Sequence, residues 1–419
     1  MAVVGAGLSG LAAAWWLQAA GHRVTLFEQL AQPGFTARNV EVLHAGQTHR
    51  IDVPLRVFYP GYYPTLGALY DELGVASEPV SYAATLCGPD RLPHFRYRNL
   101  RWGSQSFGWL APQDLLLGRT ARRIVGGLLR FHRQAPLDLA RGALDGCTIA
   151  DYLAREAYPQ EFVAGFVLPA LCTVATCSYA QGREIPAAVV VDYLVHGLAR
   201  QAVHRVRSGA DEVLKRVLPV LAGVHCDAAV VNVLARDDRV TLHLADGQSL
   251  NVDHAVLAAP AHQSRTLLAP QHAAEAELLA RFRYEPVEVL THRDESLMPR
   301  NRRDWSPVNL HLTPDAEAPE STIWVNAVQP LLRDAEPVFQ TVHPLRQPDP
   351  ARVLGRARFD RPMVGADTAS ALATLDHLQA QPGRRLWFCG SYAAAGIPLL
   401  ESAASSARRV VQAIGPATP

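Results

Sequence analysis

Three glycines near the amino terminus constrain the fold of this chain more than any other feature. A short apolar run, Ala2–Val4, leads into Gly5-Ala6-Gly7-Leu8-Ser9-Gly10 and then a helical stretch. Gly21 ends that stretch, and a second apolar run closes on Glu28. Strand, glycine turn, helix and strand in this order are typical of a dinucleotide-binding unit. The first thirty or so residues therefore predict a dinucleotide site.

Each glycine of this motif has a physical role at such a site. Gly5 permits the tight turn, Gly7 lets the backbone approach a diphosphate, and Gly10 lets the helix pack closely on the strand. The helix N-terminus offers free N–H groups and the positive end of its dipole to the phosphates. Glu28 ends the second strand, where a carboxylate can accept both ribose hydroxyls and repel a 2′-phosphate.

The carboxyl-terminal segment 384–406 predicts a second contact with the same cofactor. We interpret it as a short strand over 386–389, a break at Gly390, a loop to Gly396 and a helix beginning near Pro398. The backbone at Gly390 can then approach a ribityl or phosphate chain, and the helix N-terminus points at the O2 region of a flavin. An ordinary terminal strand and helix is the alternative. Because the glycine motif opens the chain and this segment closes it, FAD is favoured over NAD.

With these two ends, the sequence resembles the amine oxidase and phytoene desaturase superfamily of FAD enzymes. Members begin with VVGAGLSGL-like segments, here Val3–Leu11, and end with FCG-like segments, here Phe388–Gly390. The resemblance is closest to a bacterial branch described as FAD/NAD-binding oxidoreductases, through the internal blocks Ile51–Val75 and Val289–Leu310. It implies an α/β fold: a discontinuous Rossmann-like FAD-binding domain of the glutathione-reductase type with an α+β substrate domain.

Two positions depart from the pattern of this superfamily. Its glycine-glycine-arginine segment appears here as 32–38, so only Gly34 and Arg38 carry over. The acidic residue that often follows the FCG segment is Ser391. The resemblance also implies that Val230 presents its backbone to the adenine. The motif and the resemblance together assign the following residues to FAD: Gly5, Gly7, Leu8, Ser9, Gly10, Glu28, Gln29, Gly34, Arg38, Val230, Gly390, Ser391, Gly396 and Leu400.

The length of 419 residues predicts two joined domains with the chain crossing between them. We expect the FAD-binding domain to comprise 1–75, 205–265 and 376–419. Residues 76–204 are predicted to be the helical part of a substrate domain that caps the cavity, and 266–375 its sheet. Within the latter, Pro344–Arg361 is rich in proline, arginine and aspartate and is predicted to be a surface connection.

Composition excludes several classes of protein. With 49% hydrophobic residues, 19% charged residues and a net charge of +1, the chain has no polyanion-seeking excess, so nucleic acid is an unexpected partner. The cysteines lack metal-type spacing and are expected to be reduced and buried. Cys172 and Cys177 could approach each other on a helix, with core packing favoured over a redox pair. No signal peptide or apolar run of about twenty residues is seen, which predicts a cytoplasmic protein.

One stretch leaves membrane contact open. Leu115–Arg133 interleaves apolar residues with arginines and predicts an amphipathic basic helix. A helix packed on its domain is favoured, and peripheral membrane contact is the alternative, which would fit a lipid or acyl substrate. The sequence does not predict the oligomeric state.

The reaction depends on the residues beside the flavin. Amine oxidases of the superfamily commonly use a lysine in the region corresponding to about 280–310, whereas the only lysine here is Lys215. We therefore favour desaturation or double-bond isomerisation of a hydrophobic acyl or polyene chain. Amine oxidation and a flavin-binding protein with a mainly structural role are the alternatives, and a dehydrogenase that uses only NAD would be colourless.

Candidate catalytic residues come from the two internal blocks. His292 and Asp294 could exchange a proton with the substrate, or they could simply pin a turn before Met298. Tyr62, with its neighbours Tyr59 and Tyr63, could clamp a carboxylate or form an aromatic wall. The alternative for the tyrosines is a purely structural role, packing in the core.

Overall fold

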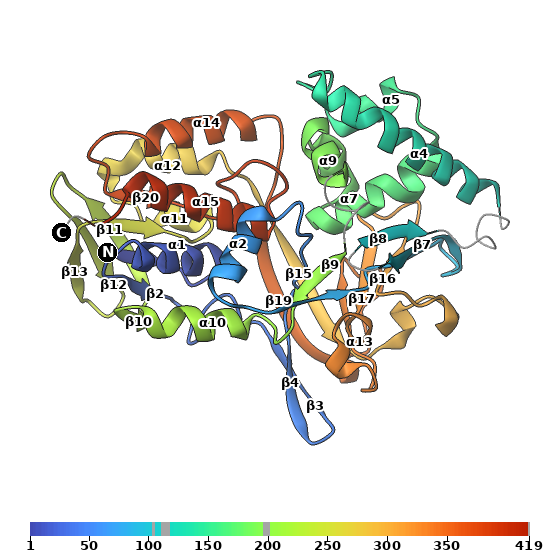
Figure 1. Cartoon of the computed structure of the whole chain (residues 1–419), viewed down its shortest axis with the longest axis horizontal. Coiled ribbons are helices and arrows are strands. Elements are labelled where there is room, and N and C mark those ends of the chain that lie inside the picture. The colour runs from blue at the N-terminus through green and yellow to red at the C-terminus, as the bar shows by residue number, and fades with distance from the viewer. Residues whose placement is uncertain (103–104, 110–117, 196–201, 418–419) are drawn as a thin grey trace.

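The computed structural model describes residues 1–102, 105–109, 118–195 and 202–417. Figure 1 shows two regions, a Rossmann-like region that holds both termini and a second region built on a large sheet with helices above it. The predicted α/β fold, a Rossmann-like domain joined to a substrate domain, is confirmed.

A five-stranded parallel sheet forms the centre of the first region, in the order β10-β2-β1-β14-β20. All three residues of β1 and of β14 are buried, as expected for parallel strands covered on both faces. The strands come from three separate parts of the chain, so this sheet is discontinuous. Their bounds are β1 Ala2–Val4, β2 Thr25–Phe27, β10 Gly223–His225, β14 Ala255–Leu257 and β20 Leu386–Phe388.

Alternating side chains of β1 pack on the two layers that cover this sheet. Val3 belongs to the core shared with one set of helices, α1 Leu8–Ala19, α2 Pro64–Glu72, α10 Asp211–Val217 and α15 Leu400–Ile414. Ala2 and Val4 belong to the opposite core. That core is built from the antiparallel strands β11 Val230–Ala235, β12 Val240–Leu244 and β13 Ser249–Val252, and the helices α11 Ala261–Thr266, α12 Ala273–Ala280 and α14 Thr368–Gln379.

The second region is built on an eight-stranded mixed sheet, in the order β19-β15-β18-β17-β16-β6-β7-β8. Its only parallel pair among the described strands is β16 with β6. The bounds are β6 Ala84–Cys87, β7 Pro93–Trp102, β8 Gln105–Trp109, β15 Tyr284–His292, β16 Val308–His311, β17 Glu320–Trp324, β18 Phe339–Val342 and β19 Val353–Pro362; the short helix α13 Val325–Val328 follows β17. Two smaller antiparallel pairs are β3 Val40–His44 with β4 Gln47–Ile51, and β5 Ser77–Val80 with β9 Val203–Val206.

Helices lie above one end of this sheet (Figure 1). They are α4 Arg119–Ala140, α5 Ile149–Arg155, α6 Gln160–Phe162, a π-helical turn Val163–Val167, α7 Leu168–Ala175, α8 Tyr179–Glu184 and α9 Ala187–Tyr193. We call this group the helical cap.

Two predictions about the second region are wrong. Residues 76–204 are not only helical, because they also supply β5 to β8 and the first half of β9. Pro344–Arg361 is not only a surface connection, because from Val353 it is the edge strand β19, paired along β15. The many charged residues of this segment made its strand pattern hard to recognise. Its side chains alternate between exposed and buried, with Arg356 and Arg358 exposed and Ala357 buried.

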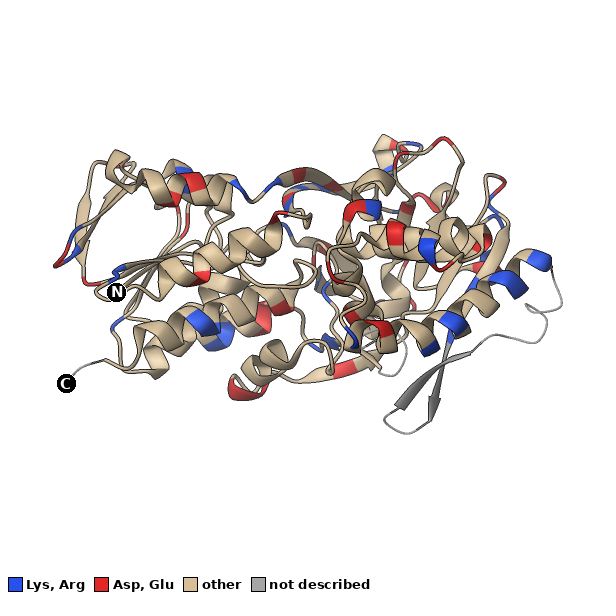
Figure 2. Cartoon of the chain, turned by 90° about the horizontal axis from the view of Figure 1, so that it is seen from above, with Lys and Arg blue, Asp and Glu red and all other residues tan. Residues whose placement is uncertain are grey.

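The predicted basic helix is α4, which begins at Arg119; residues 115–117 lie outside the described part of the chain. Ile124 and Phe131 are buried, so one face of α4 packs on the other helices of the cap. On the outer side Arg123 pairs with Glu161, and Figure 2 shows further basic residues along the helix. Within the described ranges, no helix is both long and apolar enough to span a bilayer.

The two adjacent glycines of α4 provide a matched test of this packing. A Cβ added to Gly127 would lie 2.4 Å from Cγ of Phe162, which is fully buried. We expect Gly127→Ala to lower the free energy of unfolding by about 1–3 kcal/mol, because the ring cannot move aside. Gly126 is exposed with nothing within 4 Å, so Gly126→Ala is expected to raise stability by up to about 1 kcal/mol. Equal urea midpoints for the two variants would contradict this account.

Candidate functional site

The glycine turn has the backbone geometry that a bound diphosphate needs. Gly5 has φ +104°, which L side chains rarely adopt. A Cβ on Gly10 would lie 1.9 Å from the carbonyl oxygen of Gly5, so this position holds the helix close to the turn. At Gly7 a Cβ would meet no atom within 4 Å. The first and third glycines are therefore required by the fold, while the space in front of Gly7 is open to a ligand.

The N-terminus of α1 carries no side-chain cap. The hydroxyl of Ser9, the second residue of the helix, donates to the carbonyl of Ala258, at 3.4 Å, and so ties the helix to the sheet. The N–H groups of the first turn, including those of Leu8 and Ser9, accordingly keep their capacity to bind an anion. This arrangement fits the diphosphate of a dinucleotide.

Glu28 has a second role that the sequence did not reveal. Its side chain is buried, and Oε2 accepts from the N–H groups of Ala6, at 2.9 Å, and Gly34, at 3.2 Å. Oε1 accepts from the N–H of Leu30 at 3.0 Å. The carboxylate thus clamps the loop after β2 onto the glycine turn. Since a carboxylate has about four acceptor positions, room remains for a ribose hydroxyl.

The other predicted cofactor residues differ in burial. Gln29 and Arg38 are exposed, whereas Val230 is buried. Gly34 faces the Glu28 carboxylate, because its added Cβ would lie 3.0 Å from Oε2. Ser391 and Leu400 are half-buried.

Gly390 has a structural reason to be glycine. An added Cβ would lie 2.7 Å from the ring of Tyr392. Its N–H donates to Oγ of Ser406, and that hydroxyl lies 2.9 Å from the Gly390 carbonyl. The residue therefore joins β20 to α15, in addition to any contact with a cofactor.

The loop before α15 is tied to the segment before α2. Gly396 has φ +94°, and its added Cβ would lie 3.0 Å from the hydroxyl of Tyr62. The carboxylate of Glu401 accepts from the N–H groups of Thr65 and Leu66, at 3.1 and 2.9 Å. Because α15 begins at Leu400, Pro398 lies just before the helix rather than in its first turn. The carboxyl-terminal part of the predicted cofactor site thereby meets the segment that carries the candidate tyrosines.

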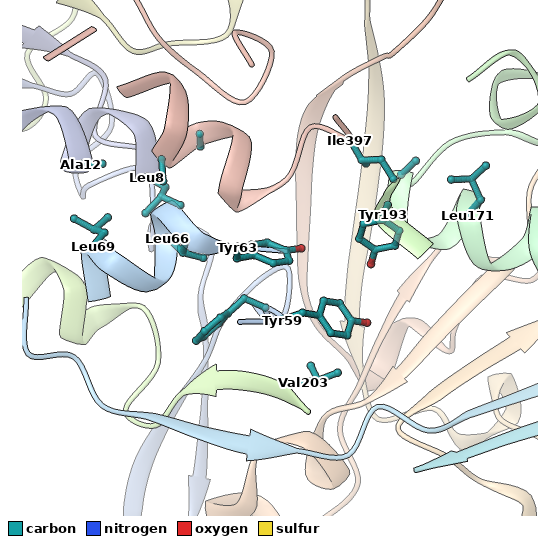
Figure 3. Packing of buried hydrophobic residues seen from close by; sticks show 14 of the residues in the cluster. Leu8, Ala12, Tyr59, Tyr63, Leu66, Leu69, Leu171, Tyr193, Val203 and Ile397 are labelled. Atoms are coloured by element: carbon teal, nitrogen blue, oxygen red, sulfur yellow. The ribbon is translucent and has the colours of Figure 1, made fainter. Parts of the chain in front are cut away.

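Four tyrosines gather where this segment meets the helical cap. Tyr59, Tyr62 and Tyr63 precede α2, and Tyr193 comes from α9; the rings of Tyr62 and Tyr193 lie 4.9 Å apart, edge to face. Figure 3 shows the hydroxyl groups of Tyr59, Tyr63 and Tyr193 turned toward the same region. We call this set the tyrosine group.

The tyrosine group remains protonated at neutral pH. Burial raises the pKa of Tyr62 to about 12, against the opposing effect of a hydrogen bond from the Ile397 backbone. Burial also raises the pKa values of Tyr59, Tyr63 and Tyr193 well above the ordinary value. These hydroxyls are therefore hydrogen-bond donors rather than general bases.

His292 and Asp294 are occupied in holding a turn. His292 is fully buried at the end of β15; Nε2 lies 2.8 Å from Oγ1 of Thr341, and Nδ1 accepts from the N–H of Asp294 at 3.1 Å. Asp294 accepts from the N–H groups of Ser296 and Asp349. The opposite end of β15, at Tyr284, contacts Tyr392 of the Rossmann-like region, so His292 lies about 26 Å farther along the strand. We leave both residues out of the proposed site.

Burial of His292 predicts a pH effect on stability. Burial lowers the pKa of His292 to about 4, and the stability linked to its neutral form is lost as pH falls from about 6.5 through 4. Between pH 7 and pH 4 the wild-type protein should lose about 3 kcal/mol more than His292→Gln, measured by urea unfolding. Parallel pH profiles would show that His292 is not the group responsible.

An open depression of about 580 Å³ lies near this turn and is lined in part by Arg91, Ser296, His311 and Arg346. Arg346 and Ser296 are in contact, which places the depression beside Asp294 rather than beside the glycine turn. It is thus separate from the predicted cofactor site.

The glycine turn and the parallel sheet define a Rossmann-like region, which is joined to a second region built on a mixed sheet. Residues 3–73 match the family model described as an NAD(P)-binding Rossmann-like domain. No curated protein sequence matches the chain.

Solved structures share this fold over nearly their whole length. The CLA-producing fatty acid isomerase from P. acnes is 14% identical with a TM-score of 0.67, covering 98% of this chain and 97% of that chain. Cyclohexylamine oxidase from Brevibacterium oxydans IH-35A is 15% identical with a TM-score of 0.64, covering 99% and 98%. A triple mutant of putrescine oxidase, redesigned in cofactor binding, is 16% identical with a TM-score of 0.59, covering 99% and 97%. The resemblance to this superfamily therefore holds at the level of the fold.

Proposed function

We propose that the chain is an FAD-dependent oxidoreductase. The observation that carries this proposal is the open space at Gly7, in front of an uncapped helix N-terminus and next to the buried carboxylate of Glu28. An NAD site would require the same turn. FAD is favoured because the predicted cofactor residues continue from the glycine turn to the loop 390–399 and the start of α15. This loop contacts the tyrosine group, so a cofactor that extends along it would reach the second region of the molecule.

The residues of this chain would bind and orient the cofactor and its substrate. N–H groups of Leu8 and Ser9 would hold the diphosphate, and the free acceptor position of Glu28 would hold a ribose hydroxyl. When bound, the flavin supplies hydride chemistry at N5. The tyrosine rings, with the buried side chains of Leu171 and Ile397, would exclude water and present an apolar wall to the substrate.

Desaturation or double-bond isomerisation of an acyl or polyene chain is the reaction we favour. No lysine is available between 280 and 310, and Lys215 lies on α10 with a side chain 69% exposed beside Glu212. The fold shared with a fatty acid isomerase supports this choice. Amine oxidation is the second candidate, because aromatic rings can surround a cation and an amine oxidase shares the fold.

The test begins with the absorption spectrum of the purified protein. We expect a yellow protein with flavin bands, from which denaturation releases FAD. Linoleate, a carotenoid and cyclohexylamine are then mixed with it without oxygen, and both flavin bleaching and isomerised products are measured. Bleaching or isomer formation with the acid or the carotenoid supports the proposal. Bleaching by the amine alone would shift it to the second candidate, and a colourless protein that takes up no FAD would overturn it.

A further inference from the structure

Arg361 faces inward from the edge strand β19. The side chains of this strand alternate, so that Arg356 and Arg358 point outward and both pair with Glu288. Ala357 and Phe359, on the inward face, pack against Val53 and Val289. Arg361 follows in the inward series, which brings its guanidinium toward the helical cap.

The contacts of Arg361 come from the cap and the tyrosine group. Its Nε donates to Oγ1 of Thr176 at 2.8 Å, just after α7 ends. Its charge also acts on the neighbouring Tyr63 and Cys177. Three separate parts of the chain therefore meet at this guanidinium: the sheet edge, the cap and the segment before α2.

No carboxylate among the described residues lies within ion-pair distance of Arg361. Glu285, directly opposite in the β15–β19 register, is exposed and does not pair with it. Three other arginines whose pKa is lowered by burial each have a carboxylate partner: Arg56 has Asp52, Arg205 has Glu78 and Arg384 has Glu275. Burial lowers the pKa of Arg361, so its guanidinium is poorly solvated. Such a cation without a counter-ion is costly, and natural proteins rarely keep one for stability alone.

We infer that Arg361 binds the carboxylate of the substrate, with the hydroxyl of Tyr63 as a second donor. This inference rests on the proposed function and narrows its substrate class to carboxylic acids with a long apolar chain. The guanidinium offers a planar fork that matches a carboxylate. The same positive charge repels a protonated amine, which separates this reading from amine oxidation.

Competition binding to the holoprotein tests the head-group preference directly. Linoleate, linoleyl alcohol and linoleyl amine compete for the bound fluorescent acid cis-parinarate, so the readout is independent of turnover and of flavin colour. We expect wild-type protein to bind linoleate at least tenfold more tightly than the alcohol, and the amine least tightly. Equal affinity for acid and alcohol would overturn the inference, even in a protein that holds FAD.

Variants of Arg361 test whether this residue causes the preference for the carboxylate. Arg361→Gln should weaken linoleate binding 10- to 100-fold and leave the alcohol unchanged, while Arg361→Lys should keep part of the preference. Arg358→Gln is the matched control on the outward face of the same strand and should bind like wild type. Unchanged linoleate affinity in a folded Arg361→Gln protein would contradict the assignment. Should that variant not fold, the wild-type comparison of head groups and the lysine variant still decide the question. The absence of bound FAD is a different result, which would contradict the proposed function rather than the assignment of Arg361.

Discussion

Gly7→Val is expected to weaken FAD binding by at least 100-fold and to yield a colourless protein that is still folded. The backbone at Gly7 has φ −73°, which valine adopts without strain, and no atom of the protein lies within 4 Å of the added Cβ. The isopropyl group would instead fill the space assigned to the diphosphate, which must approach the bare backbone. A 100-fold loss corresponds to about 2.7 kcal/mol. FAD titration followed by fluorescence, together with circular dichroism, measures both parts of the expectation.

Gly126→Ala serves as the control for this variant, since Gly126 also has no neighbour within 4 Å but lies on the outer face of α4. It should bind FAD like wild type. A yellow Gly7→Val protein with unchanged affinity would show that the cofactor does not pass this turn.

Glu28→Gln is expected to lower the free energy of unfolding of the flavin-free protein by about 2–4 kcal/mol and to weaken FAD binding as well. The carboxylate accepts three backbone N–H groups with its two oxygens. The amide nitrogen of glutamine would turn a donor toward at least one of them, and each buried group left unsatisfied costs about 1–3 kcal/mol. Urea unfolding without flavin isolates the structural part of this effect.

Glu41→Gln is the matched control, because Glu41 is 63% exposed and pairs only loosely with Arg50. Its stability should change by less than about 1 kcal/mol. If Glu28→Gln unfolded at the same urea concentration as wild type while losing FAD, Glu28 would be a ligand without the clamping role.

The parts of the fold that sequence predicts are those whose signals are local. The glycine turn, α1 and the acidic end of β2 lie within thirty residues, and each requires a residue type that the sequence displays directly. The parallel strands beside β1 were recognisable for the same reason, as short apolar runs bounded by turns. In these elements the backbone geometry at a single position requires a particular residue type, so the sequence indicates the structure directly.

The second region could not be predicted in this way, because its contacts join distant segments. β6 pairs with β16, more than two hundred residues later in the chain, and the sequence of neither strand indicates this pairing. Arg361 looked like one of many surface arginines until the register of β19 showed which way it points. His292 was singled out for its chemistry, whereas its burial and its bond to Thr341 became visible only in the folded chain.

The discontinuous central sheet has a consequence for biosynthesis. Ala2 pairs with Ala255, and Ala255 pairs with Leu386, so the central sheet is completed only when most of the polypeptide has left the ribosome. Until then the nascent strand β1, even when paired with β2, has one unpaired edge that other chains or chaperones can engage. Folding of this protein should accordingly be a late, largely post-translational event, and slow in keeping with its many long-range pairings.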